Sequence, residues 1–203
     1  MTDAADAQAP LEAMLKEEIV RMYQEVADNP KSTFHFFHGR EAAEMFDYSR
    51  EWLDRAPASA VDSFAGVGNP HLRSELAPGE TVLDLGSGAG LDAIIASWRV
   101  GPGGSVIGLD LNPAMCRKAQ AHAEATGARM ECRVGRVEDI PLPEASVDVA
   151  LSNGVINLSF RKRRVIEEIY RVLRPGGRIS ITDIVSAKQL SQSIVNDPKL
   201  WAS

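Results

Sequence analysis

Cysteine is scarce in this chain, and its scarcity excludes two kinds of structure. The 203 residues include two cysteines, Cys116 and Cys132, so neither a disulfide framework nor a four-cysteine zinc site can form within the chain. Both are expected to be buried as small apolar side chains. No apolar run reaches the roughly 18 residues that a membrane-spanning helix needs. The N-terminus is acidic and alanine-rich, unlike a signal peptide, so we expect a cytoplasmic protein.

An excess of basic residues is also lacking. The formal net charge is −6, whereas a nucleic-acid partner usually requires a basic face. One basic run, Arg161-Lys162-Arg163-Arg164, could bind phosphate. Because the chain as a whole is acidic, we expect this run instead to be the solvent-exposed first turn of a helix. The 44% apolar and 25% charged content is that of an ordinary soluble protein, and the length suits one domain with a sizeable core.

What the chain does have is a short apolar segment that leads into three glycines at alternate positions, Thr81-Val82-Leu83-Asp84-Leu85-Gly86-Ser87-Gly88-Ala89-Gly90-Leu91-Asp92. This pattern predicts a strand, a sharp turn and a helix start, where glycine lets the backbone approach a ligand closely. Free N–H groups at that helix start would point at the ligand. Dinucleotide-binding turns carry glycine or alanine where Leu91 stands, which disfavours an NAD site. A tight turn without a ligand is the alternative.

The run Asp84-Leu85-Gly86-Ser87-Gly88-Ala89-Gly90 resembles motif I of class I S-adenosylmethionine-dependent methyltransferases, usually written D-x-G-x-G-x-G. The resemblance implies S-adenosyl-L-methionine as the cofactor. It also implies that the motif holds this cofactor through Asp84, Gly86, Ser87, Gly88 and Gly90.

Strands and helices are expected to alternate from residue 81 onward. The expected strands are 81–85, 105–110, about 130–135, 147–152 and 178–185, and the expected helices are about 90–100, 113–126 and 162–173. Alternation of this kind predicts an α/β fold, a Rossmann-like and mainly parallel sheet with helices on both faces. Residues 187–195 are expected to be helical.

The family normally adds two further strands as an antiparallel hairpin at the sheet's edge, and this chain appears from its sequence to lack them. We therefore expect residues 179–185 to form an exposed apolar edge, which is an association hazard. The sequence predicts either a truncated form or a homodimer, in which a second copy covers this edge.

Residues 1–60 are expected to form an N-terminal helical lid or extension, and residues 61–203 the methyltransferase domain. In the first part, residues 1–9 are expected to be disordered, a helix to run from Pro10 to Asn29-Pro30, and one or two helices to follow within 40–56, ended by Pro57.

The segment Phe34-His35-Phe36-Phe37-His38-Gly39 is unusually aromatic. It is interpreted either as an apolar plug packed on the main domain or as a lid, in which His35 and His38 face the substrate. Two histidines three residues apart are a weak signal for a metal ion, and no metal site is predicted.

Asp110 follows the second expected strand, about twenty residues beyond the glycine turn. In this geometry a carboxylate accepts hydrogen bonds from both ribose hydroxyls of an adenosyl group, although a helix-capping or surface role is the alternative. Met115 could pack on the adenine. The run from Gly135 to Pro143 resembles the family's G-D-A-E-D-h-P-h segment, with Arg136 in place of the aspartate that contacts adenine. The remaining cofactor candidates are Leu111, Val137, Glu138 and Asn153.

The fourth strand runs into Ser152-Asn153-Gly154-Val155-Ile156-Asn157-Leu158-Ser159, which closely resembles a segment of the arsenite methyltransferases. The resemblance implies that this edge faces both the methionine part of the cofactor and the substrate. The substrate-facing candidates are therefore His35, His38, Asn69, Gly154 and Asn157. The family's arsenic-binding cysteines would stand at Gly154 and approximately at Val67, so we do not extend arsenite to this chain as a substrate.

The sequence thus predicts methyl transfer to a small-molecule acceptor, with no nucleic-acid or membrane partner. No general base is evident, and Asn153 and Asn157 are the candidates for positioning groups. A cofactor-binding but inactive module is the first alternative, and an NAD-dependent oxidoreductase is the second.

Overall fold

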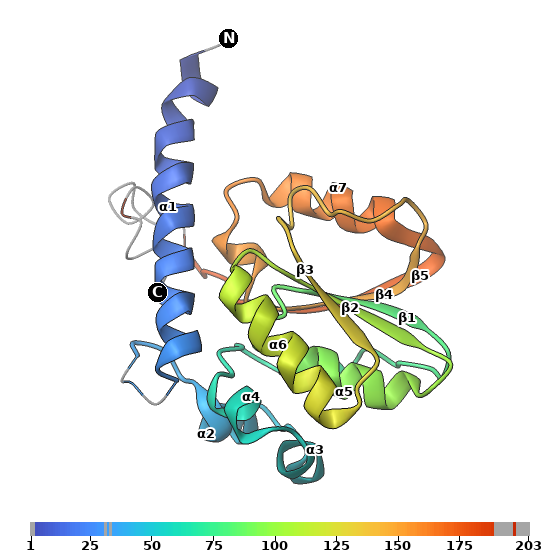
Figure 1. The fold of residues 1–203 in the computed structure, drawn as a ribbon. Helices are drawn as coiled ribbons and strands as arrows, with labels where there is room; N and C mark the ends of the chain where they lie inside the picture. Colours follow the sequence, from blue (N-terminus) through green and yellow to red (C-terminus); the bar gives the residue numbers. More distant parts are fainter. Residues whose placement is uncertain (1–2, 31, 33, 189–196, 198–203) are drawn as a thin grey trace.

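The computed structural model describes residues 3–30, 32, 34–188 and 197. Its centre is a five-stranded sheet in the order β3-β2-β1-β4-β5, in which every neighbouring pair is parallel. The strands are β1 (Thr81–Leu85), β2 (Ser105–Asp110), β3 (Met130–Val134), β4 (Val147–Asn153) and β5 (Leu173–Thr182). β1 lies in the middle, so the glycine turn that follows it leaves the sheet at the centre of its carboxyl edge (Figure 1).

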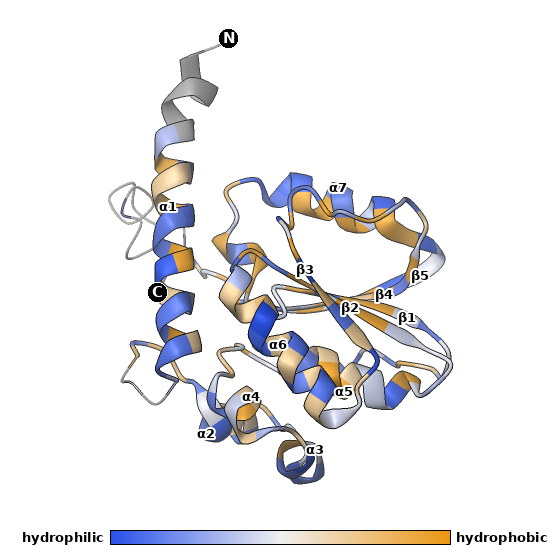
Figure 2. Ribbon diagram, viewed as in Figure 1, coloured by the Kyte–Doolittle hydropathy of each residue, from blue (hydrophilic) through white to orange (hydrophobic). Residues whose placement is uncertain are grey.

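Helices cover both faces of this sheet. α5 (Leu91–Val100) and α6 (Pro113–Thr126) lie on one face, and α7 (Lys162–Val172) lies on the other (Figure 1). Each face has its own cluster of buried side chains, and the apolar residues of α7 point toward the strands (Figure 2). Burial of these apolar surfaces is the main force that holds the layers together. The predicted Rossmann-like α/β fold is confirmed.

Local signals determine where these helices begin and end. The Asn112 side chain accepts a hydrogen bond of 2.8 Å from the backbone N–H of Ala114, and Pro113 occupies the first helical position of α6. Gly127 ends α6 with a φ of 65°, and Gly90 precedes α5 with a φ of 89°, a backbone region that favours glycine.

The N-terminal segment is helical, as predicted, but one boundary was wrong. α1 (Asp3–Asp28) extends through Pro10 to Asp3, where the sequence suggested disorder. Alanines are frequent before Pro10 and favour a helix, and proline within a helix removes a single backbone donor. The 40–56 prediction is confirmed by α2 (Gly39–Met45) and α3 (Arg50–Arg55), while α4 (Ala58–Asp62) follows Pro57 unpredicted.

The fifth strand also differs from its prediction. β5 begins at Leu173 rather than Arg178, ends at Thr182 rather than Val185, and has an irregularity in its pairing with β4. Leu173 pairs with Val147 and Arg178 with Val149, so the Pro-Gly-Gly segment between them bulges out of the ladder. The predicted helix at 187–195 lies almost entirely outside the described residues.

Candidate functional site

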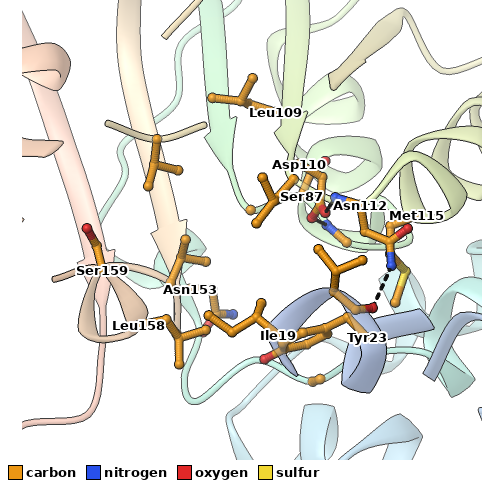
Figure 3. Close-up of a pocket in the computed structure, with 18 of the residues that line it drawn as sticks. Ile19, Tyr23, Ser87, Leu109, Asp110, Asn112, Met115, Asn153, Leu158 and Ser159 are labelled. Carbon is orange, nitrogen blue, oxygen red and sulfur yellow. Dashed lines mark hydrogen bonds between the residues drawn. The ribbon is translucent and has the colours of Figure 1, made fainter. Parts of the chain in front are cut away.

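A cavity opens at the carboxyl edge of the sheet, where β2, β1 and β4 end side by side. The glycine turn after β1 lines its floor, and α1 crosses it from the opposite side. Figure 3 shows Ile19 and Tyr23 of α1 facing Ser87, Asp110 and Met115, with Asn153 and Leu158 at the other end. In an open parallel sheet this edge is where ligands bind.

The glycine turn has the shape that a close backbone approach requires. Gly86 has a φ of 64°, and a Cβ at that position would lie 2.3 Å from Cγ2 of Val155. Gly88 has a φ of 50°, and a Cβ there would meet no protein atom within 4 Å. Gly88 also lines the cavity, so the space beside it is available to a ligand.

Asp110 forms the β2 side of the cavity. Its Oδ2 accepts a 2.8 Å hydrogen bond from the backbone N–H of Gly88, and its Oδ1 accepts one of 2.8 Å from that of Asn112. A carboxylate has about four acceptor positions, so two remain for a ligand's hydroxyl groups. Burial raises the pKa of Asp110, although these backbone hydrogen bonds oppose the shift.

Asp84 lies beneath the turn and does not line the cavity. Its side chain is buried, and its Oδ2 has no hydrogen-bond partner within the described part of the chain. Burial, followed by the nearby charge of Asp92, raises the pKa of Asp84 well above its ordinary value. Asp84 therefore supports the turn from behind.

The outer wall is supplied by α1. The side chain of Asn112 donates a 3.2 Å hydrogen bond to the carbonyl of Val20, which joins α6 to α1 (Figure 3). Glu12 bridges Arg136 at 2.8 Å and Arg161 at 2.9 Å, from two different loops of the sheet edge. Burial raises the pKa of Tyr23 to about 12, with help from the charges of Asp110 and Asp183.

Asn153, at the end of β4, joins the sheet to the loop before β1. Its Oδ1 accepts hydrogen bonds from the backbone N–H of Val67 and the hydroxyl of Thr182, both at 2.8 Å. Its Nδ2 donates to the carbonyl of Gly68 at 2.9 Å and to Asp92 at 3.1 Å. The amide of Asn153 is thus engaged by the protein itself and holds the 66–68 loop at the cavity.

The two positions where the arsenite enzymes would carry cysteines lie against each other. A Cβ at Gly154 would stand 3.2 Å from Cγ1 of Val67. Side chains at these two positions would therefore meet, but a valine and a glycine stand there in place of two thiols. Cys116 is buried in α6 and Cys132 is half-buried in β3, and neither lines the cavity.

The cavity gathers many, though not all, of the residues singled out from the sequence. Its lining includes Gly86, Ser87, Gly88, Asp110, Leu111, Met115, Val137, Glu138, Asn153 and Gly154. Asp84, Gly90, His35, His38, Asn69 and Asn157 lie outside that lining.

The histidines of the aromatic segment have another environment. His35 is exposed, and His38 packs edge-on against Phe34 and Phe36, the second of which stacks on Tyr23. Asn69 is buried, and its side chain accepts a 3.0 Å hydrogen bond from the backbone N–H of His71.

Sequence reasoning missed the α1 residues and Asp92 as parts of the wall. The apolar stripe of α1 is a signal that it packs on something, but periodicity does not identify the surface. Asp92 stands two residues beyond the last glycine of the turn, and that position in a first helical turn was the available signal.

Comparisons with known proteins agree with this geometry. Residues 76–203 match the methyltransferase domain family. The chain is 45% identical over 142 residues to an arsenite methyltransferase of Halobacterium salinarum, covering 70% of this chain and 36% of that protein. It is 35% identical over 116 residues to the nocamycin O-methyltransferase of Saccharothrix syringae, covering 57% of this chain and 41% of that one.

Among solved structures, an arsenic(III) S-adenosylmethionine methyltransferase from Chlamydomonas reinhardtii aligns with a TM-score of 0.62 at 37% identity. The alignment covers 79% of this chain and 53% of that one, so this chain spans about a third to a half of the relatives it matches. The chain belongs to the methyltransferase domain family, and its fold is that of the class I S-adenosylmethionine-dependent enzymes, close to the arsenite methyltransferases.

Proposed function

We propose that this chain binds S-adenosyl-L-methionine in the cavity and transfers its methyl group to a small-molecule acceptor. The observation that carries the proposal is the pairing of the open glycine turn with Asp110, whose carboxylate bonds the turn at Gly88 and keeps free acceptor positions. The adenosyl hydroxyls would bond Asp110, with Leu111, Met115, Val137 and Glu138 around the adenine. The methionine end would lie over Gly86 and Ser87 toward Asn153.

When bound, the cofactor supplies an electrophilic methyl group on a positively charged sulfur. The residues of this chain bind and orient it and exclude water, which is how positioning lowers the barrier to transfer. Asn153 is a positioning residue that acts through the 66–68 loop. The proposed role for Asn157 is similar, because its backbone N–H donates a 3.0 Å hydrogen bond to Asp183 beside the end of β5.

The acceptor we propose is a small molecule other than arsenite. Trivalent arsenic is a soft centre that prefers thiolate ligands. Val67 and Gly154 stand instead at the two positions of the family's thiols, and Gly154 lines this end of the cavity. A valine and a glycine at these two positions support an organic acceptor whose reacting atom is already nucleophilic.

The N-terminal 60 residues form, in this proposal, a lid over the cofactor. The supporting observations are the position of α1 across the cavity and the Glu12 bridge to Arg136 and Arg161. His35 and His38 would reach a substrate only in another arrangement of the segment, since they do not line the cavity here.

Two further proposals concern the whole chain. We propose a homodimer through β5, which within the described residues pairs with β4 alone and exposes Ile179 and Ile181. We also propose that the protein works in the cytoplasm, where its free cysteines would remain reduced. No described helix has the length and hydropathy of a membrane span.

Calorimetric titration tests the function. Binding of S-adenosylmethionine without binding of NADH, followed by turnover of the methyl donor with a panel of thiols and small organic acceptors, is the expected result. Cofactor binding without any turnover would favour the inactive module. NADH binding alone would favour the oxidoreductase.

A further inference from the structure

The cavity contains a second buried acid, Asp92, in the first turn of α5. It lines the wall, and its side chain is 10% exposed. The hydroxyl of Tyr48 donates a 2.5 Å hydrogen bond to its Oδ1, and the Nδ2 of Asn153 donates one of 3.1 Å to its Oδ2. Both donors are neutral, so they solvate the carboxylate without cancelling its charge.

His71 is the remaining neighbour of Asp92. Its Nε2 lies 3.1 Å from Oδ1 of Asp92, at an angle outside that of a good hydrogen bond, so the contact is electrostatic. Its Nδ1 lies 3.4 Å from the guanidinium of Arg99, which can only donate. Among the described residues, no arginine or lysine pairs with Asp92 within 4.0 Å.

The order of the strands places this charge opposite the adenosyl end. Asp110 ends β2, the glycine turn follows β1, and Asn153 ends β4, in that spatial order. Because Asp92 is hydrogen-bonded to Asn153, it lies on the β4 side of the turn, beside the edge that would face an acceptor. If Asp110 held the ribose of a cofactor, Asp92 would lie on the far side of the turn from it.

The neighbouring acid strengthens this assignment. Asp84 lies behind the same turn, and burial together with the charge of Asp92 raises its pKa well above the ordinary value. Asp84 therefore favours the neutral form, whereas the carboxylate of Asp92 lies in the cavity wall and accepts hydrogen bonds from Tyr48 and Asn153.

We propose that Asp92 is the specificity-determining residue by which the site distinguishes the sulfonium cofactor from its neutral thioether product. The inference rests on the proposed function. Methyl transfer leaves an uncharged sulfur, so the attraction of Asp92 is present before transfer and absent afterward. Asp92 thereby favours binding of the donor and release of the product. Its bond to Asn153 links this charge to the 66–68 loop.

Titration calorimetry on Asp92→Asn tests the proposal through the ratio of the dissociation constant of S-adenosylhomocysteine to that of S-adenosylmethionine. The ratio should fall about tenfold in the variant, chiefly because the charged ligand binds more weakly. The control is Tyr48→Phe, which removes one donor to Asp92 and keeps the charge, so its ratio should stay near that of the wild type.

A purely structural role for Asp92, such as support of the α5 start, would weaken both ligands equally and leave the ratio unchanged; that result would overturn the proposal. Should Asp92→Asn fail to fold, the wild-type protein provides a second measurement. An analogue that carries an ammonium in place of the methylsulfonium should bind more tightly than S-adenosylhomocysteine, and weaker binding would overturn the proposal. If neither adenosyl ligand binds, the proposed function fails instead.

Discussion

At the scale of single residues, the two acids around the glycine turn have opposite roles although they are eight positions apart in the sequence. Asp84 is buried with an unpartnered oxygen, whereas Asp92 is surrounded by polar donors. Burial without a partner penalises the charged form of a carboxyl group. Environment, rather than residue type, therefore raises the pKa of Asp84.

This difference predicts how the stability of the protein depends on pH at Asp84. In the folded protein the pKa of Asp84 lies well above its ordinary value of 3.8. Between these two pKa values the folded state holds a proton that the unfolded state releases. The free energy of unfolding therefore falls as pH rises from 3.8 to the folded pKa. The variant Asp84→Asn cannot ionise at this position, so its stability does not fall in this way as pH rises. We expect its midpoint of thermal unfolding to exceed that of the wild type by a larger margin at pH 8 than at pH 5, by about 2–4 °C per kcal/mol gained.

Asp139→Asn, at an exposed site, is the matched control and should show little difference between the two pH values. Scanning calorimetry at both pH values measures the margin. An identical margin for Asp84→Asn at pH 5 and pH 8 would mean that this carboxyl group is not held neutral in the folded state.

The Val67–Gly154 contact gives a second prediction at this scale. A variant with both Val67→Cys and Gly154→Cys should gain arsenite binding, since the two side chains would meet where soft thiolate ligands are needed. Its stability should fall by about 1–2 kcal/mol, because Gly154 has a φ of 74° that disfavours a side chain.

Equilibrium dialysis with arsenite measures this gain, and the wild type gives the background from Cys116 and Cys132. Each single variant should bind more weakly than the double variant. If the double variant binds no more arsenite than the wild type, the two positions do not form a thiol site.

At the scale of secondary-structure elements, α1 is the part of the chain that closes the cavity. Its attachment depends on the Glu12 bridge, in which Arg136 and Arg161 both contact one carboxylate. Partial burial pushes the pKa of Glu12 up, but the hydrogen bonds and charges of the two arginines outweigh it and hold the pKa below 4.5. This ion-pair bridge is therefore fully formed above pH 4.5 and is lost as pH falls through the lower, folded value, while the burial of Leu15 and Val26 remains.

Glu12→Gln should loosen α1 and speed the dissociation of bound S-adenosylhomocysteine by about two- to fivefold, as expected for about 0.5–1 kcal/mol from partly exposed ion pairs. Surface plasmon resonance gives the rate. Glu17→Gln, an exposed change on the same helix, should leave it unaltered. A dissociation rate equal to that of the wild type would show that α1 does not retain the ligand.

At the scale of the whole molecule, the proposed homodimer depends on the exposed edge of β5. Ile179 is 49% exposed on this strand, and Ile166 is 46% exposed on α7. An edge strand offers unpaired backbone groups as well as apolar side chains to a second copy. We expect the wild type to show a concentration-dependent dimer in analytical ultracentrifugation.

Ile179→Lys should shift this equilibrium toward the monomer, because it places a charge on the paired edge. Ile166→Lys changes a side chain of similar exposure away from β5 and should leave the dimer intact. Equal effects of the two substitutions would point to general solubility rather than to pairing of the edges.

Much of the fold could be predicted because its signals are local. A strand, a glycine turn and a helix start lie within the 81–92 run, and Asn112 with Pro113 marks the next helix within two residues. Asp110 could be predicted beside the turn because parallel strands end at one edge.

Only the tertiary structure decided which helix forms the outer wall of the site and which residues pair with its acidic side chains. Glu12 meets Arg136 across 124 residues, and Asn153 meets Asp92 across 61. Contacts of this kind depend on how whole helices pack, and neither propensity nor periodicity specifies them. The sequence by itself therefore determined the glycine turn and Asp110 at the site, while packing decided which helix lines the outer wall, where Asp92 finds its hydrogen-bond partners and where the histidines lie.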